Sequence, residues 1–218
     1  VTADDRCVPT EVFDELGRST VGELAQFHAG DPLSRGMPID VLRDLVFRGV
    51  SPAVTRAVLA KLEREGKIAM LNQAITELCS LPDSQIVDIS SFYESEPAYE
   101  TRQDAFANAV IEIKTELAPL VLLDELMKIE AELGRDRSKK AKANGPRTID
   151  LDLLWMDGET HGGKKLRLPH PLIGERDFVL VPLEDLMHDP ARFFRYNGVE
   201  VKEPEDRVGH IVGELGRM

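Results

Sequence analysis

The chain has 218 residues, which is enough for one full domain or two small ones, and 42% of them are hydrophobic, which is ample for a core. Its 39 acidic and 27 basic residues give a net charge of -12, which disfavours general attraction to nucleic acid or anionic membranes. No apolar run approaches the roughly 20 residues that span a bilayer, and the first residues lack the pattern of a signal peptide, so we expect neither. Cys7 and Cys79 lie too far apart in sequence to suggest a disulfide or metal framework. We therefore expect a cytoplasmic protein that does not enter the membrane.

Residues 1–68 have helical periodicity and predict three or four short helices. In the last of them, Ser51 is the expected N-cap, Pro52 the first helical residue and Gly66 the stop. Helix, turn, helix, glycine and a short strand is the element order of a winged helix.

The stretch from Phe27 to Pro38, together with the helix predicted to begin near Ile39, resembles a winged-helix module of selenocysteine-specific elongation factors. The resemblance covers about residues 1–68, and in that family some modules bind an RNA hairpin. The wing should follow Gly66, but the next residues indicate another structure, so the module looks truncated. Its nine basic and eleven acidic residues form no phosphate-binding stripe. Nucleic-acid binding is therefore not the first expectation, and residues 1–68 are where it would occur.

The remaining chain alternates between helical and strand periods, which favours an α+β domain over 69–218. The predicted elements are a helix over 69–81, a strand over 86–93, a loop over 94–104 and a strand over 106–115. A second helix carries a stripe of Leu122, Leu126, Ile129 and Leu133 and should stop at Gly134. Farther on, Phe178 should lie at the start of another apolar strand, and 192–218 should form an edge hairpin and a short terminal helix.

Two carboxylates, Asp150 and Asp152, stand out in an otherwise apolar run from Ile149 to Trp155. In a strand they would share one face, while the apolar residues between and around them would face a core. Paired carboxylates held this close repel each other, and a hard divalent cation is the usual remedy. A half-buried strand with a solvated acidic face explains the spacing equally well.

A basic cluster precedes the two carboxylates in this otherwise acidic chain. It comprises Arg135, Arg137, Lys139, Lys140, Lys142 and Arg147. A solvated basic loop is the plain interpretation. The position next to a predicted metal site favours phosphate binding instead, because phosphates held by divalent ions and by Lys or Arg recur in phosphoryl transfer.

The motifs in this region resemble those of the 6-hydroxymethyl-7,8-dihydropterin pyrophosphokinase family. They are Ile129 to Arg137, Gly145 to Asp152, Leu168-Pro169-His170 and Arg176-Asp177-Phe178, and the match covers about residues 69–190. The resemblance implies a ferredoxin-like α+β fold. It also implies an ATP-dependent enzyme that transfers pyrophosphate to the pterin hydroxymethyl group and releases AMP, with two Mg2+ ions.

The resemblance also assigns residues to roles. The metal ligands would be Asp150 and Asp152, and the catalytic phosphate contacts Arg135 and Arg147. The nucleotide side would be held by Glu130, Arg137, His170 and Arg176. The pterin would bind at Ser95, Pro97, Phe106, Asn108 and Phe178, with the two phenylalanines sandwiching its ring.

The sequence departs from the family pattern in three features. Asn144 stands where the family has an aromatic, and Met127 where it has Gln or His. The family's first strand and Gly-Ser-Asn turn have no counterpart before the helix predicted at Ala69. Two other hypotheses therefore stay open: a non-catalytic fusion whose residues 1–68 bind RNA or protein, and a junction of fragments that cannot close its sheet.

Overall fold

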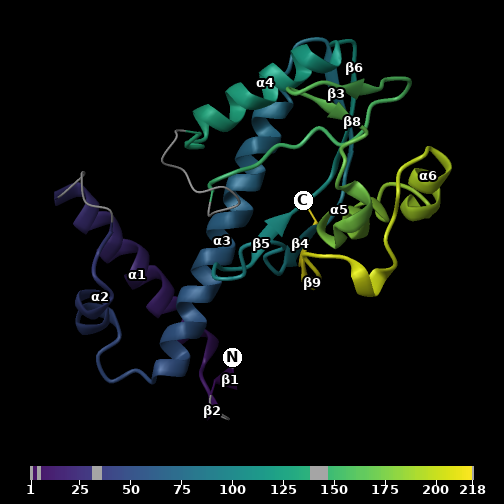
Figure 1. Cartoon of the computed structure of the whole chain (residues 1–218). Coiled ribbons are helices and arrows are strands. Elements are labelled where there is room, and N and C mark those ends of the chain that lie inside the picture. The colour runs from purple at the N-terminus through teal and green to yellow at the C-terminus, as the bar shows by residue number, and fades with distance from the viewer. Residues whose placement is uncertain (1, 4–5, 31–35, 138–146, 218) are drawn as a thin grey trace. The chain divides into compact units, whose positions relative to one another are not determined.

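The computed structural model describes residues 2–3, 6–30, 36–137 and 147–217, and the chain divides into two compact units, Val1–Gly66 and Lys67–Met218. The boundary falls inside one continuous helix, α3 (Pro52–Leu78), which is labelled in Figure 1. The prediction that Gly66 ends a helix is therefore wrong, as is the expected start of a new helix at Ala69. A glycine costs only about 1 kcal/mol in a helix interior, which the surrounding helix formers offset.

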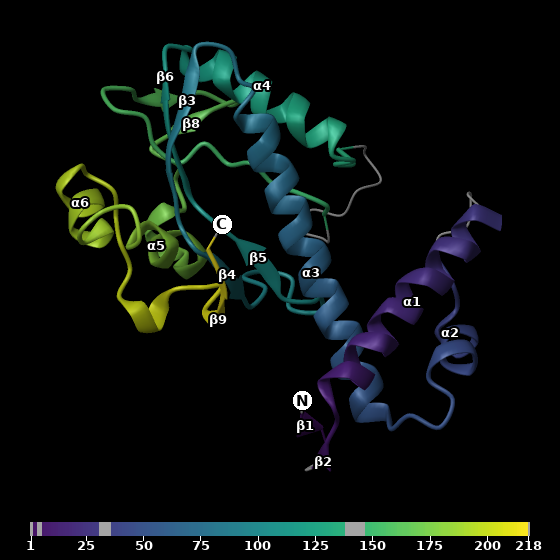
Figure 2. The same cartoon turned by 180° about the vertical axis from the view of Figure 1, so that it is seen from behind.

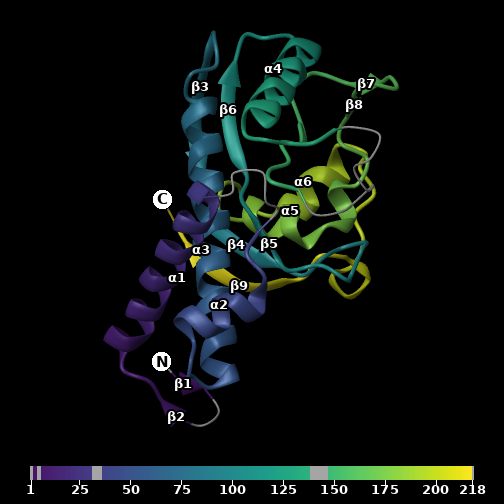
Figure 3. The same ribbon diagram turned by 90° about the vertical axis from the view of Figure 1, so that its left-hand side faces the viewer.

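The first unit is built from helices with a small apolar core. α1 (Thr10–Gly30), α2 (Ile39–Val46) and the first part of α3 pack together (Figure 3), and β1 (Thr2–Ala3) pairs with β2 (Arg6–Cys7). Its buried residues are Phe13, Leu42, Phe47, Val54 and Val58. The predicted cap is confirmed, because the Ser51 hydroxyl accepts a hydrogen bond from the backbone N–H of Val54 at 3.3 Å.

The second unit mixes helices with short antiparallel strands, so the α+β prediction is confirmed at this level. β3 (Ser84–Ile89) pairs with β6 (Ile111–Thr115), and β4 (Phe92–Ser95) lies between β5 (Phe106–Asn108) and β9 (Ile211–Gly216). Each predicted long strand is thus two strands. The first break falls at Ser90, whose hydroxyl accepts from the backbone N–H of Val110 at 2.9 Å. This contact turns the chain from one strand pair to the other.

α4 (Pro119–Glu132) ends where the sequence predicts. Gly134 has φ +85°, a left-handed conformation that suits glycine and stops a helix. A small hairpin of β7 (His161–Gly162) and β8 (Arg167–Leu168) follows, and then the short helix η1 (Ile173–Glu175).

Two predictions for the C-terminal part are wrong. The apolar run after Arg176 is a helix, α5 (Asp177–Leu183), because a short apolar run has no period that separates a strand from a buried helix. The tail contains α6 (Pro190–Tyr196), η2 (Pro204–Asp206) and β9, and not a hairpin with a terminal helix. The tail ends as a strand because β4 offers it a ladder partner.

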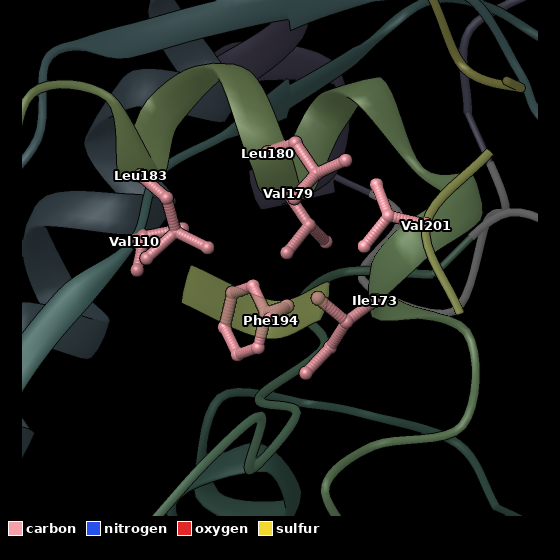
Figure 4. Packing of buried hydrophobic residues seen from close by; sticks show 7 residues of the cluster. All are labelled: Val110, Ile173, Val179, Leu180, Leu183, Phe194 and Val201. Carbon is pink, nitrogen blue, oxygen red and sulfur yellow. The ribbon is translucent and has the colours of Figure 1, made fainter. Parts of the chain in front are cut away.

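Two apolar clusters hold the second unit together, one beneath α4 and the other beneath α5 and α6, and Figures 1 and 2 show these helices in different parts of the unit. In the first cluster, α4 and the last part of α3 bury Leu78, Leu81, Leu122, Leu126 and Ile129. In the second, α5 and α6 cover Val110, Ile173, Val179, Leu180, Leu183, Phe194 and Val201 (Figure 4). Over the described ranges, no helix combines the length and the apolar character needed to cross a membrane.

Candidate active site

The acidic stretch that carries Asp150 and Asp152 is extended but is not a strand. Residues 150–156 have no ladder partner among the described residues, so the strand prediction is wrong for this segment. The predicted alternation still holds, since Ile149 is buried and Leu151 packs against the cluster under α4. Side-chain packing thus places both carboxylates on one side without a β-ladder.

The backbone of this stretch bonds to neighbours other than a strand. The Ile149 carbonyl accepts from Arg135 Nη1 at 2.5 Å, and the Leu154 carbonyl accepts from the backbone N–H of His170 at 2.8 Å. The N–H of Leu151 donates to Glu130 Oε1 at 2.8 Å. These contacts satisfy polar groups that a sheet would otherwise pair.

Three predicted arginines meet the two predicted metal ligands. Arg135 and Arg147 place Nη1 at 2.6 Å and 3.1 Å from the two carboxylate oxygens of Asp150. Arg176 Nη1 lies 3.4 Å from Asp152 Oδ2. The side chains of Asp150 and Asp152 remain 28% and 44% exposed, so both carboxylates are accessible to a ligand. This geometry brings together anion-binding and cation-binding groups.

Glu130 is the most buried charged group of the cluster, with an exposed fraction of 0%. Its carboxylate accepts from the Nε and Nη2 of Arg137 and from the N–H of Leu151, and Arg135 Nη1 lies 3.6 Å away. Complete burial gives Glu130 no surface to offer a nucleotide. In this structure its carboxylate links Arg137 to the backbone of the acidic stretch.

His170 lies beside the carboxylates, after the cis peptide bond between Leu168 and Pro169. Its Nδ1 accepts from the backbone N–H of Leu172 at 3.2 Å. Burial lowers the pKa of His170 below its ordinary value, against the opposing charge of Asp152. The ring is therefore neutral near pH 7, and Nε2 carries its proton.

The predicted pterin residues come together at the paired ends of β4 and β5. Ser95 stands opposite Phe106 in the ladder, and the side-chain amide of Asn108 donates to the Ser95 hydroxyl at 2.9 Å. Pro97 follows β4 and is half-buried. Because α5 packs against both strands, Phe178 at its start belongs to the same part of the unit.

The surroundings of Phe178 contain residues that the sequence did not single out. The guanidinium carbon of Arg176 lies 5.3 Å from the centre of the Phe178 ring. A Cβ added to Gly209 would lie 2.3 Å from Phe178 Cδ1, so the glycine is required for this close approach. Tyr99 contacts Arg176 from the loop after β4. An aromatic residue in a polar loop was the only sequence signal for Tyr99.

Part of the basic cluster lies outside the described residues. Its Lys139, Lys140 and Lys142 are not described, and neither are Asn144 and Gly145 of the adjoining family motif. Met127, the other departure from the family pattern, lies on α4 and is 36% exposed. Within the described ranges, His, Cys, Asp and Glu side chains form no group of three or more that could hold a metal.

Two carboxylates fit magnesium chemistry. Mg2+ is commonly bound through one or two protein carboxylates, with substrate phosphates and water completing the coordination. The oxygen donors and the exposure of Asp150 and Asp152 match this requirement. Carboxylates that can hold a metal ion, together with arginines that can hold phosphates, are typical of enzymes that transfer phosphate groups from a nucleotide.

Comparison with known proteins identifies the particular family. The family model described as 7,8-dihydro-6-hydroxymethylpterin-pyrophosphokinase matches residues 63–188. A 2-amino-4-hydroxy-6-hydroxymethyldihydropteridine pyrophosphokinase of Methylorubrum extorquens is 42% identical over 137 residues, which cover 62% of this chain and 85% of that protein. Proteins of the same name from Haemophilus influenzae and Bacillus subtilis are each 40% identical, over 56% and 53% of this chain and 74% and 68% of their own lengths. The chain belongs to the 7,8-dihydro-6-hydroxymethylpterin-pyrophosphokinase family.

The first unit has a separate similarity. The winged-helix model of elongation factor SelB matches residues 21–75. This match and the pyrophosphokinase match overlap over residues 63–75, which lie inside α3. The overlap places the change from one similarity to the other within a single helix.

Proposed function

We propose that this chain transfers the pyrophosphoryl group of ATP to the hydroxymethyl oxygen of 6-hydroxymethyl-7,8-dihydropterin and releases AMP, a step of folate biosynthesis. The observation that carries the proposal is the contact of Asp150 and Asp152 with Arg135, Arg147 and Arg176, at 2.6 to 3.4 Å. The names of the curated relatives support the same reaction.

The reaction joins the acceptor oxygen to the β-phosphorus of ATP. The bond from that phosphorus to the oxygen shared with the α-phosphate breaks, AMP leaves with the electron pair, and the hydroxymethyl proton passes to solvent water. Arg135 and Arg147 would bind the phosphate oxygens and offset the charge that develops on the leaving group. In the described structure their nitrogens bond to Asp150, so nucleotide binding would exchange one anionic partner for another.

The two carboxylates would hold the metal. Asp150 and Asp152 would bind two Mg2+ ions shared with the triphosphate, which would offset its negative charge. Before magnesium arrives, the arginines neutralise the two carboxylates, which explains how they lie two residues apart in a half-buried stretch.

The remaining predicted residues divide between the two substrates. Arg137, His170 and Arg176 would contact the nucleotide, and Glu130 would act through Arg137. The pterin would hydrogen-bond to Asn108 and stack between Phe106 and Phe178, with Ser95 and Pro97 lining its entrance. The Ser95 hydroxyl already orients the Asn108 amide, because it accepts from that amide at 2.9 Å.

We further propose that residues 69–218 form a ferredoxin-like domain without the family's first strand. The acidic stretch and β6 would be the neighbours of that strand, and residues 150–156 have no ladder partner among the described residues. The contacts of Glu130, Arg135 and His170 with the backbone of this stretch support it as a substitute arrangement. Residues 1–68 would form the second domain.

An assay of AMP release tests the function. The full chain is incubated with ATP, MgCl2 and the dihydropterin, and AMP is measured by chromatography, with the dihydropterin omitted in the control. We expect AMP only in the complete mixture. No AMP above the control, together with no binding of either substrate by calorimetry, would exclude the proposed activity.

The match of residues 21–75 to a winged helix supports a second candidate, in which the first unit binds RNA and the second serves as a scaffold. Binding through phosphates would weaken steeply as salt is raised. A titration with an RNA hairpin between about 50 and 200 mM salt distinguishes the two. Absent or salt-independent binding would contradict the RNA function.

A further inference from the structure

We propose that Tyr99 is a positioning residue for Arg176, which makes the arginine's contact with Asp152 depend on the loop at 96–105. The inference rests on the proposed function for the roles of Arg176 and Asp152. It goes beyond that function because Tyr99 carries none of the roles assigned to the site.

The contacts of Arg176 define a fixed place for its side chain. Its Nε donates to the Tyr99 hydroxyl at 3.2 Å, and its Nη1 lies 3.4 Å from Asp152 Oδ2. Its guanidinium carbon lies 5.7 Å from the centre of the Tyr99 ring and 5.3 Å from the centre of the Phe178 ring. The side chain is only 11% exposed. Arginine has several rotatable bonds, so each of these contacts removes conformations that would take it away from Asp152.

The Tyr99 hydroxyl has a defined direction because of Glu175. It donates its proton to Glu175 Oε1 at 3.1 Å, which leaves its lone pairs for the Nε–H of Arg176. Lys202 holds that carboxylate through a 3.0 Å ion pair. This hydrogen bond from Lys202 is the main reason that the pKa of Glu175 lies below its ordinary value, so Glu175 stays an acceptor.

Tyr99 reaches Arg176 from the loop between the two strands that carry the pterin residues. The loop is held at its start by the Glu96 N–H, which donates to the His210 carbonyl at 2.9 Å. It is held at its end by Lys67 Nζ, which donates to the Ala105 carbonyl at 2.6 Å. Between these points, the Tyr99 side chain contacts Glu175 and Arg176. The hydrogen bond between Tyr99 and Arg176 therefore depends on the position of this loop.

The variant Tyr99→Phe removes the hydroxyl and keeps the ring. In the full chain we expect kcat to fall about tenfold, as for a lost hydrogen bond to a charged group, with the KM for ATP changed less than about twofold. In an Arg176→Ala background, adding Tyr99→Phe should cost less than about twofold more, because the two residues act together. Losses that multiply would overturn the proposal, since they would mean that Tyr99 acts independently of Arg176.

A second measurement does not depend on activity. The Nε–H of Arg176 is observed by nitrogen NMR in the full chain, and its exchange with water should be at least about tenfold faster in Tyr99→Phe because its acceptor is gone. Tyr196→Phe is the control, since Tyr196 is 90% exposed on α6 and should change neither kcat nor this exchange. Unchanged exchange in Tyr99→Phe would overturn the proposal even in an active enzyme. A wild-type chain without AMP release but with the expected exchange would refute the proposed function alone.

Discussion

Oε1 of Glu130 lies 2.8 Å from the backbone nitrogen of Leu151, the residue between the two predicted metal ligands. A buried carboxylate on α4 therefore occupies a hydrogen-bonding position that a neighbouring strand would fill in a sheet. The same carboxylate pairs with Arg137. One side chain thus fixes the acidic stretch and an arginine of the proposed nucleotide site.

Replacing Glu130 should destabilise the second unit. Glu130→Ala leaves the N–H of Leu151 and the guanidinium of Arg137 without this partner, and we expect the free energy of unfolding to fall by about 3 kcal/mol. Glu130→Gln keeps one oxygen acceptor and should lose less. Urea unfolding followed by fluorescence of Trp155 measures both variants. A stability of Glu130→Ala equal to that of the wild type would show that this carboxylate is dispensable.

Replacing the two predicted metal ligands should reduce activity without unfolding the chain. Asp150→Asn and Asp152→Asn remove the negative charges that would hold magnesium, and we expect kcat for AMP release to fall by about a hundredfold or more. Asp88→Asn is the matched control, because Asp88 lies on β3 and forms an exposed ion pair with Arg217. Mg2+ titration by calorimetry should show weaker binding only in the first two variants. Full activity in either of them would exclude the metal assignment.

Gly209 should control the shape of the proposed pterin pocket. Its φ is +65°, and an added Cβ would meet Phe178 Cδ1 at 2.3 Å, so Gly209→Ala must move that ring. We expect the KM for the pterin to rise several-fold and the stability to fall by about 1–3 kcal/mol. Gly213→Ala, on β9, is the control, because its added Cβ would meet nothing within 4 Å. An unchanged pterin KM in Gly209→Ala would argue against Phe178 as a stacking residue.

Glu175 should make stability depend on pH in the acid range. Its pKa is lowered from 4.5, chiefly by the hydrogen bond from Lys202, so the unfolded chain binds this proton more readily than the folded chain. The stabilisation is therefore present above pH 4.5 and is lost as pH falls through the folded pKa. The stability gap between the wild type and Glu175→Gln should shrink between about pH 6 and pH 3.5 in urea unfolding. An equal gap at both pH values would refute the ion pair as its source.

Local patterns predicted several features because neighbours in sequence decide them. The stripe through Leu126 and Ile129 identified α4, and Gly134 ended it through its own backbone conformation. The alternation around Leu151 separated the buried from the exposed side of the acidic stretch even though no ladder forms there. Alternation needs only a buried side, which α4 supplies.

Other features depended on partners that lie far away in sequence. Whether the run after Arg176 becomes a helix or a strand depends on what it packs against. It forms α5, which packs against β4 and β5 and contributes Leu180 to the apolar cluster. Gly66 lies inside α3, which continues to Leu78, so the local glycine signal did not end the helix. Gly209 had no sequence pattern, and Tyr99 stood out only as an aromatic residue in a polar loop, since their importance lies in contacts with Phe178 and Arg176.

The sequence by itself determined the family and the extent of α4, and it predicted the residues that would carry the proposed chemistry. The tertiary structure alone decided how Asp150 and Asp152 are held: by Arg135, Arg147, Arg176 and the backbone contact of Glu130 rather than by a described neighbouring strand. The physical reason is that side-chain type and periodicity are local properties of the chain. Hydrogen-bond satisfaction and charge pairing depend on which distant groups the fold brings within about 3 Å.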